Sequence, residues 1–138
     1  MDTFSDYGPA LVSVILYAVV AQVLNAATGI RKGGEDIAPG ASQEPDYQNA
    51  SYRLDRTYMN TIEMMVFFIA LVFAAILAGA NPLWVNMLAS AGVSLRIAAN
   101  IFYIKGIGKA YGGLRTKISI LASIVNLALA TLAFLAIF

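Results

Sequence analysis

The sequence contains no cysteine and no histidine among its 138 residues, and only 12% of them are charged. The absence of cysteine excludes disulfides, thiolate metal sites and a cysteine nucleophile. The absence of histidine removes the usual general base and the most common metal ligand. Any chemistry therefore depends on arginine, glutamate, asparagine, tyrosine and serine side chains or on a bound ligand, and we expect no metal site.

The small charged share is matched by a large apolar one. Hydrophobic residues make up 59% of the chain, whereas its charged share is about half the ~25% of an ordinary soluble domain. A soluble protein of this size exposes much of its surface and needs polar residues to cover it. The formal net charge of +1 shows no basic or acidic surplus, so we expect no nucleic-acid partner. The composition indicates an integral membrane protein.

Four apolar runs are long enough to cross a bilayer, because about 20 helical residues span a hydrocarbon core of ~30 Å. They cover residues 9–30, 58–80, 82–104 and 118–138. Only residues 79–81 separate the second run from the third, which predicts a tight antiparallel hairpin. The segment before Pro9 is acidic, which argues against a cleaved signal peptide. We predict a single all-α domain over residues 1–138, an integral membrane four-helix bundle.

The basic residues gather beside the two long polar loops. Eight of the nine lie there: Arg31, Lys32, Arg53, Arg56, Lys105, Lys109, Arg115 and Lys117. By the positive-inside rule, both loops face the cytosol and both termini face the opposite side, as in a bacterial inner membrane or the endoplasmic reticulum. We expect Lys105 and Lys109 to meet lipid head groups.

Polar residues within two of the spans recur at spacings of four and three, which stack side chains along one face of a helix. These are Arg56, Asn60 and Glu63 in the second span, and Arg96, Asn100 and Tyr103 in the third. An unpaired charge within the membrane costs at least ~2.5 kcal/mol. We therefore predict a Glu63–Arg96 ion pair facing the bundle interior. It either fixes helix register or lines a polar cavity entered from the cytosol.

The fourth span opens with Arg115 and Thr116, at the same depth as Arg56 and Tyr103. The sequence thus places several guanidinium groups, an amide and a phenol near one end of the helices. Arginine forms strong, charge-assisted hydrogen bonds to carboxylates and phosphates. This set of side chains suits a small anionic ligand.

At this point the sequence resembles a known family. Residues 56–63 read Arg-x-x-x-Asn-x-x-Glu, which resembles a signature of the MAPEG family, the membrane-associated proteins in eicosanoid and glutathione metabolism. Arg96 followed seven residues later by Tyr103, and then a short basic loop ending in Arg115-Thr116, is similar to the second signature of the family. Span count, length, topology and motif placement agree over essentially the whole chain.

The resemblance implies a homotrimer with three glutathione sites between neighbouring subunits near the cytosolic face. Glutathione is then a co-substrate. Arg56, Asn60 and Glu63 would bind it from one subunit, and Tyr103 and Arg115 from the next. Arg115 matches the arginine that activates the thiol and is the expected catalytic residue. The remaining expected binding residues are Arg31, which resembles an arginine that reaches a glutathione carboxylate, Arg96, and Thr116, which keeps the hydroxyl of a serine beside the catalytic arginine.

The chain also departs from the family pattern. Val66 stands where proline is common, Tyr58 where histidine or glutamine is common, and Ala99 where prostaglandin-synthase-like members have histidine. The last difference argues against that isomerase activity. The glycine-rich loop after Tyr103 is longer than in several relatives, so Tyr111 is a second candidate for the role of Tyr103.

Together these features predict a membrane-bound glutathione transferase or peroxidase that detoxifies apolar electrophiles or lipid hydroperoxides arriving from the bilayer. Two alternatives remain open. One is a non-catalytic relative that binds lipid or glutathione. The other is a small four-span multidrug transporter, although such transporters usually carry an essential glutamate in the first span, and residues 9–30 contain no acid.

Overall fold

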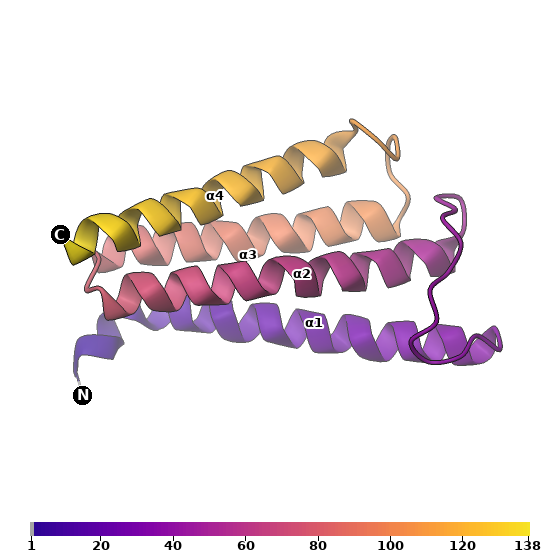
Figure 1. Cartoon of the computed structure of the whole chain (residues 1–138), viewed down its shortest axis with the longest axis horizontal. Coiled ribbons are helices and arrows are strands. Elements are labelled where there is room, and N and C mark those ends of the chain that lie inside the picture. Colours follow the sequence, from indigo (N-terminus) through magenta and orange to yellow (C-terminus); the bar gives the residue numbers. More distant parts are fainter. Residues whose placement is uncertain (1) are drawn as a thin grey trace.

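The computed structural model describes residues 2–138 and contains a short 3-10 helix, η1, followed by four long α-helices. The elements are η1 (Asp2–Tyr7), α1 (Gly8–Gly34), α2 (Ala50–Leu77), α3 (Pro82–Ile104) and α4 (Leu114–Ile137). The four long helices lie side by side as a bundle, with no strand in residues 2–138 (Figure 1). Each is long and apolar enough to cross a membrane. The predicted all-helical, four-span fold is therefore confirmed for a single chain.

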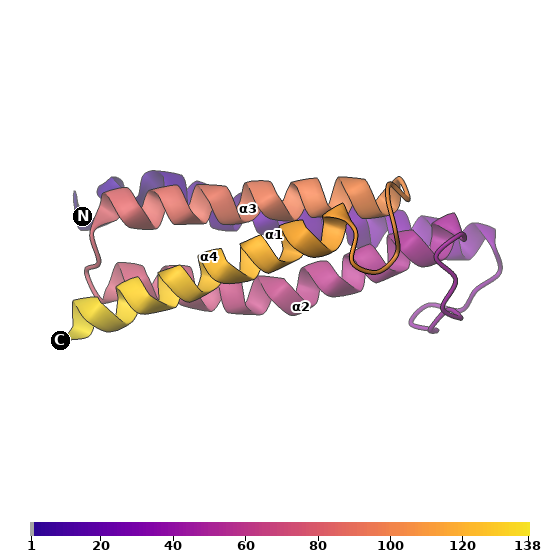
Figure 2. The ribbon, with the colours of Figure 1, turned by 90° about the horizontal axis from the view of Figure 1, so that it is seen from above.

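The two ends of the bundle differ in character. The turn between α2 and α3, η1 and the end of α4 lie at one end, and the two long loops, residues 35–49 and 105–113, lie at the other (Figures 1 and 2). This arrangement collects most of the basic residues at the loop end, which is also where the candidate site forms.

Three helices extend further toward the loops than the predicted spans. α4 begins at Leu114 instead of residue 118. α1 continues to Gly34 instead of residue 30, and α2 begins at Ala50 instead of residue 58 and ends at Leu77 instead of residue 80. The early start of α2 is explained by Asn49, whose side chain accepts hydrogen bonds from the backbone N–H groups of Ser51 and Tyr52 and so caps the helix. At 1.5 Å per residue, α1 and α2 are about 40 Å long and project beyond a ~30 Å hydrocarbon core.

The core packs aromatic and small residues between the helices. Phe68 of α2 is 1% exposed, and its ring centroid lies 5.0 Å from that of Tyr17 in α1. Gly92 of α3 allows this packing, because a Cβ at that position would lie 2.9 Å from Cε2 of Phe68. Large apolar side chains such as Ile15 and Phe134 point outward instead, as expected for helices that contact lipid.

The predicted hairpin forms at the end opposite the loops. Gly79 has a positive φ of 72°, which favours glycine at this turn. The Tyr7 hydroxyl donates a hydrogen bond to the carbonyl of Ala80, and Asn86 both accepts from the N–H of Ala10 and donates to the carbonyl of Asp6. These bonds tie the start of the chain to the hairpin and fix the registry of α1 against α3.

Candidate functional site

A polar pocket of about 410 Å³ lies at the loop end of the bundle, where α2, α3 and α4 meet the two long loops. Its lining residues come from these five segments: Pro45, Tyr47, Tyr52, Arg56, Asn60, Tyr103, Ala110 and Arg115. Four of the residues that the sequence predicted as site residues, Arg56, Asn60, Tyr103 and Arg115, therefore line one pocket within a single chain. The expected division of these residues between two subunits stays a prediction, since the structure describes a single chain.

Arg115 is held at the start of α4 by an aromatic contact. Its guanidinium carbon lies 4.2 Å from the centroid of the Tyr103 ring, a cation–π contact. The side chain is half-buried, and its Nε is buried without a hydrogen-bond partner within residues 2–138. A buried N–H group of a charged side chain that lacks an acceptor is costly. An anionic or strongly accepting ligand in the pocket would satisfy it.

Arg56 and Asn60 reach the pocket from α2, one helical turn apart. Nη1 of Arg56 lies 3.7 Å from Oε1 of Glu63, and both side chains are about half exposed, so this pair is long and weak. Glu63 lines neither of the two pockets found at this end of the bundle. The guanidinium of Arg56 therefore keeps hydrogen-bonding capacity for a ligand.

The predicted Glu63–Arg96 ion pair is wrong. Arg96 is 3% exposed and turns into the bundle, where it lies close to Tyr17, whereas Glu63 is exposed and pairs with Arg56. Nε and Nη1 of Arg96 have no hydrogen-bond partner in the described part of the chain. Arg96 lines neither pocket. It belongs to a buried polar cluster in the bundle interior, not to the pocket.

Asn100 extends this interior cluster one turn closer to the loops. The residue is 6% exposed, and its Oδ1 accepts a hydrogen bond of 3.2 Å from the hydroxyl of Thr61 in α2. The prediction that Arg96, Asn100 and Tyr103 share one face of α3 is confirmed, since all three are buried. Only Tyr103, the residue nearest the loops, reaches the pocket.

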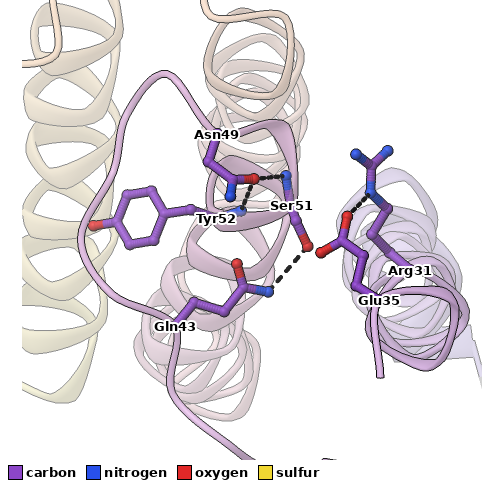
Figure 3. A network of polar contacts seen from close by, with 6 residues as sticks. All are labelled: Arg31, Glu35, Gln43, Asn49, Ser51 and Tyr52. Carbon is purple, nitrogen blue, oxygen red and sulfur yellow. Dashed lines mark hydrogen bonds and ion pairs between the residues drawn. The ribbon is translucent and has the colours of Figure 1, made fainter. Parts of the chain in front are cut away.

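Arg31 lies at the end of α1, away from the pocket. Its Nε donates to Oε1 of Glu35 at 2.9 Å, and neither residue lines either pocket (Figure 3). The pKa of Glu35 lies below its ordinary value, first because the Ser51 hydroxyl bonds the carboxylate and second because Arg31 does. Arg31 therefore does not line the pocket of its own chain, and its expected contact with the ligand stays a prediction.

Two further candidates are placed by the structure. Thr116 follows Arg115 but lines neither pocket. Tyr111 is 91% exposed and also lies outside both, whereas Tyr103 is 7% exposed at the pocket wall. Of these two candidate tyrosines, Tyr103 is therefore the one that lines the pocket.

Sequence reasoning missed the tyrosines that complete the wall, Tyr47 and Tyr52. Tyr47 lies in a loop without periodicity, so no sequence signal placed it. Tyr52 lies one turn before Arg56 on α2. Recognition of Asn49 as a helix cap would have placed Tyr52 on the same helix face as Arg56.

A second and larger cavity, of about 810 Å³, lies between α1, α2 and the first loop. Lys32 lines it and forms a short ion pair of 2.7 Å with Asp55, while its Nζ also donates to the carbonyl of Ala41. Both charged side chains are largely buried, so this pair fastens α1 to α2 and the loop. Of the adjacent residues Arg31 and Lys32, the lysine is the one that turns inward.

Four membrane-length helices and a cationic, tyrosine-lined pocket at one end define the class, an integral membrane protein. A sequence model of the MAPEG family matches residues 8–135, nearly the whole chain. The chain belongs to the MAPEG family, and the resemblance seen in the sequence is confirmed. A search of curated protein sequences found no match. It is thus a membrane protein of a family linked to glutathione and eicosanoids, which contains both enzymes and non-catalytic members.

Proposed function

We propose that this protein is a membrane-bound glutathione-dependent transferase and peroxidase. It activates the thiol of glutathione for reaction with apolar electrophiles or lipid hydroperoxides. The observation that carries the proposal is the meeting of Arg56, Asn60 and Arg115 in one pocket, with Nε of Arg115 buried and unpartnered. No described residue supplies that nitrogen with an acceptor, so a ligand is the natural source of one.

The pocket fits the chemistry of glutathione. The tripeptide offers two carboxylates, amide groups, an amine and a thiol. Arg56 and Asn60 supply donors for carboxylate and amide oxygens. The volume of about 410 Å³ falls within the ~300–1,000 Å³ typical of small-molecule sites.

Arg115 is the proposed catalytic residue. A thiol of this kind has a pKa near ~8.5, so little of it is thiolate at neutral pH. A guanidinium beside the sulfur in a partly dry pocket would lower that pKa by ~1–3 units. Arginine suits this role because it stays charged. The hydroxyl of Tyr103, a residue of the pocket wall, would add a hydrogen bond to the sulfur.

Assembly and orientation complete the proposal. A homotrimer would bring Arg31 of one subunit toward the pocket of its neighbour, which explains why Arg31 faces outward in the single chain. The loop end would face the cytosol, since it carries the basic residues. Glutathione then enters from water, and the second substrate enters laterally from the bilayer, because the outer helix faces are apolar.

Thiolate absorbance and conjugation of glutathione to a chloronitrobenzene electrophile test this proposal. We expect Arg115→Ala to lose at least about tenfold of the rate near neutral pH, since one pKa unit is a tenfold change in thiolate. Lys109→Ala is the matched control, because it removes an exposed cation of the same loop. Equal thiolate yield and rate in wild type and Arg115→Ala would remove Arg115 from the mechanism.

A second measurement separates catalysis from binding. Glutathione and its S-alkyl analogues should raise the melting temperature of the solubilised protein in proportion to ligand excess. Binding without turnover across a panel of electrophiles and hydroperoxides would identify a non-catalytic relative instead. Proton-coupled transport of a cationic dye that depends on Glu63 would favour the transporter.

A further inference from the structure

Arg53 fastens three segments together at the loop end of the bundle. From the first turn of α2, its Nη1 donates to the carbonyls of Tyr47 and Gln48 at 2.8 and 2.9 Å, and its Nε donates to the carbonyl of Ile104 at 3.1 Å. One guanidinium thus joins the first loop to the end of α3. Gly106 leaves room for it, because a Cβ there would lie 3.1 Å from Cζ of Arg53.

Tyr47 is fixed by this clamp and by a contact of its own. Its hydroxyl donates to the carbonyl of Gly108 at 3.2 Å, which joins the first long loop to the second. Its ring centroid lies 5.6 Å from that of Tyr103 and 5.9 Å from Cζ of Arg53. Tyr47 therefore packs between the clamp and the tyrosine of the pocket.

Tyr103 in turn contacts Arg115, whose Cζ lies 4.2 Å from the centroid of the Tyr103 ring. A continuous series of contacts runs from Arg53 through Tyr47 and Tyr103 to Arg115. The backbone before Arg115 does little to fix it, because Gly112 and Gly113 precede α4 and no side chain caps this helix. The aromatic contact is accordingly the main restraint on where the guanidinium points.

We propose that Tyr47 and Arg53 are positioning residues of the candidate site. They hold the ring of Tyr103 as a platform that keeps the guanidinium of Arg115 directed into the pocket. This inference rests on the proposed function, since it concerns the activation of the same thiol. It also adds a role for the first loop, which forms the wall of the pocket opposite the helices.

The proposal predicts a change in pH dependence as well as in rate. The charged and titratable groups that face the pocket are Tyr47 from the first loop, Tyr52 and Arg56 from α2, Tyr103 from α3 and Arg115 from α4. Arg115 is the cation whose position depends on the contact series. If it moves away, the pKa of the bound thiol rises toward its free value of ~8.5. Activity then falls at low pH and recovers at high pH.

Three tyrosine variants test this. We expect Tyr47→Ala to move the rising limb of the rate–pH profile upward by about one unit, a tenfold loss near pH 7 with little loss above about pH 9. Tyr47→Phe should stay within about threefold of wild type, because it keeps the ring and loses only the bond to Gly108. Tyr111→Ala, which removes an exposed tyrosine of the other loop, should leave the profile unchanged. An unshifted profile for Tyr47→Ala overturns the positioning role.

Substitutions of Arg53 test the positioning role independently. Arg53→Ala should move the rate–pH profile upward, as Tyr47→Ala does. The conservative variant Arg53→Lys should move it less. The double variant Tyr47→Ala/Arg53→Ala should be no worse than the more impaired single variant, because both act through one series of contacts. Additive losses would show that the two residues act separately and would contradict the proposal.

Hydrogen–deuterium exchange distinguishes failure of this inference from failure of the proposed function. Tyr47→Ala and Arg53→Ala should speed exchange of amides in residues 105–115 without any ligand present, while Tyr111→Ala should not. If wild type neither binds nor turns over glutathione, the proposed function fails, and the exchange data still decide whether the clamp orders this segment. If glutathione reacts but amide exchange is unchanged in both variants, the positioning role of Tyr47 and Arg53 is contradicted and the proposed function stands.

Discussion

The guanidinium of Arg115 lies over the ring of Tyr103, with Cζ 4.2 Å from the ring centroid, and so joins the first turn of α4 to the last turn of α3. A cation over an aromatic ring gains about 0.5–2 kcal/mol, depending on how far it is desolvated. The contact orients the guanidinium but leaves Nε of Arg115 without a hydrogen-bond partner among the described residues. This N–H group therefore remains available to a ligand. This pair is the centre of the candidate site.

Substitutions of Tyr103 separate the ring from its hydroxyl. Tyr103→Phe keeps the platform for Arg115, whereas Tyr103→Leu removes it. We expect the leucine variant to lower kcat/KM for glutathione conjugation by about two- to thirtyfold, the range that a cation–π contact supports. Steady-state kinetics in detergent or vesicles measure this. If phenylalanine and leucine are equally impaired, the hydroxyl and not the ring is what matters.

The buried Arg96–Tyr17 contact predicts non-additive stability effects. Tyr17→Phe removes the hydroxyl that lies close to this buried charge and should lower the unfolding free energy by about 1–3 kcal/mol. The double variant Arg96→Met/Tyr17→Phe replaces both partners by apolar groups and should be at least as stable as wild type. Thermal or denaturant unfolding in detergent measures both. A double variant less stable than Tyr17→Phe alone would show that Arg96 contributes net stability by other contacts.

Gly92 and Gly29 form a matched pair of helix glycines. A Cβ at Gly92 would lie 2.9 Å from the buried ring of Phe68, so Gly92→Ala should destabilise the bundle by about 1–3 kcal/mol through overpacking. A Cβ at Gly29 would meet nothing within 4 Å, so Gly29→Ala should be neutral or stabilising by up to about 1 kcal/mol. Melting temperatures test the contrast, and equal effects at the two positions would contradict the packing around Phe68.

The link between Glu35 and Ser51 predicts an acid-sensitive loop. Because the pKa of Glu35 is lower when folded than its ordinary 4.5, its contribution is present above that value and is lost as the pH falls through the lower native pKa. We expect the protection factors of amides at residues 35–49, which correct for the intrinsic pH dependence of exchange, to fall as the pH drops below about 4.5. Glu35→Gln should remove this dependence, whereas Asp36→Asn, which removes the neighbouring carboxylate, should retain it.

The pattern of side chains along each helix could be read from the sequence with few errors. The spacings of four and three placed Arg56 and Asn60 on one face, and Arg96, Asn100 and Tyr103 on another, and the structure agrees. What spacing does not give is the rotation of one helix against its neighbour. Glu63 and Arg96 each lie on the expected face, yet one points outward and the other inward, so the predicted pair does not form.

Residues at helix ends and in loops are also difficult to place from the sequence. One residue along a helix is a rotation of about 100°, which separates the exposed Arg31 from the buried Lys32 at the end of α1. Tyr111 was a second candidate for the role of Tyr103 in the sequence, and only the path of the glycine-rich loop placed Tyr103 in the pocket and Tyr111 in solvent. Tyr47 carried no signal at all, because its position depends on Arg53, which binds its backbone carbonyl.

The sequence alone determined that this chain crosses a membrane four times and belongs with the MAPEG proteins, because apolar length and motif spacing are local properties that need no knowledge of packing. Only the tertiary structure decided that one subunit brings Arg56, Asn60, Tyr103 and Arg115 into one pocket, and that Arg96 is buried elsewhere. The reason is geometric: contacts between helices depend on their relative rotation and on the loops that join them, and both follow from packing across the whole bundle.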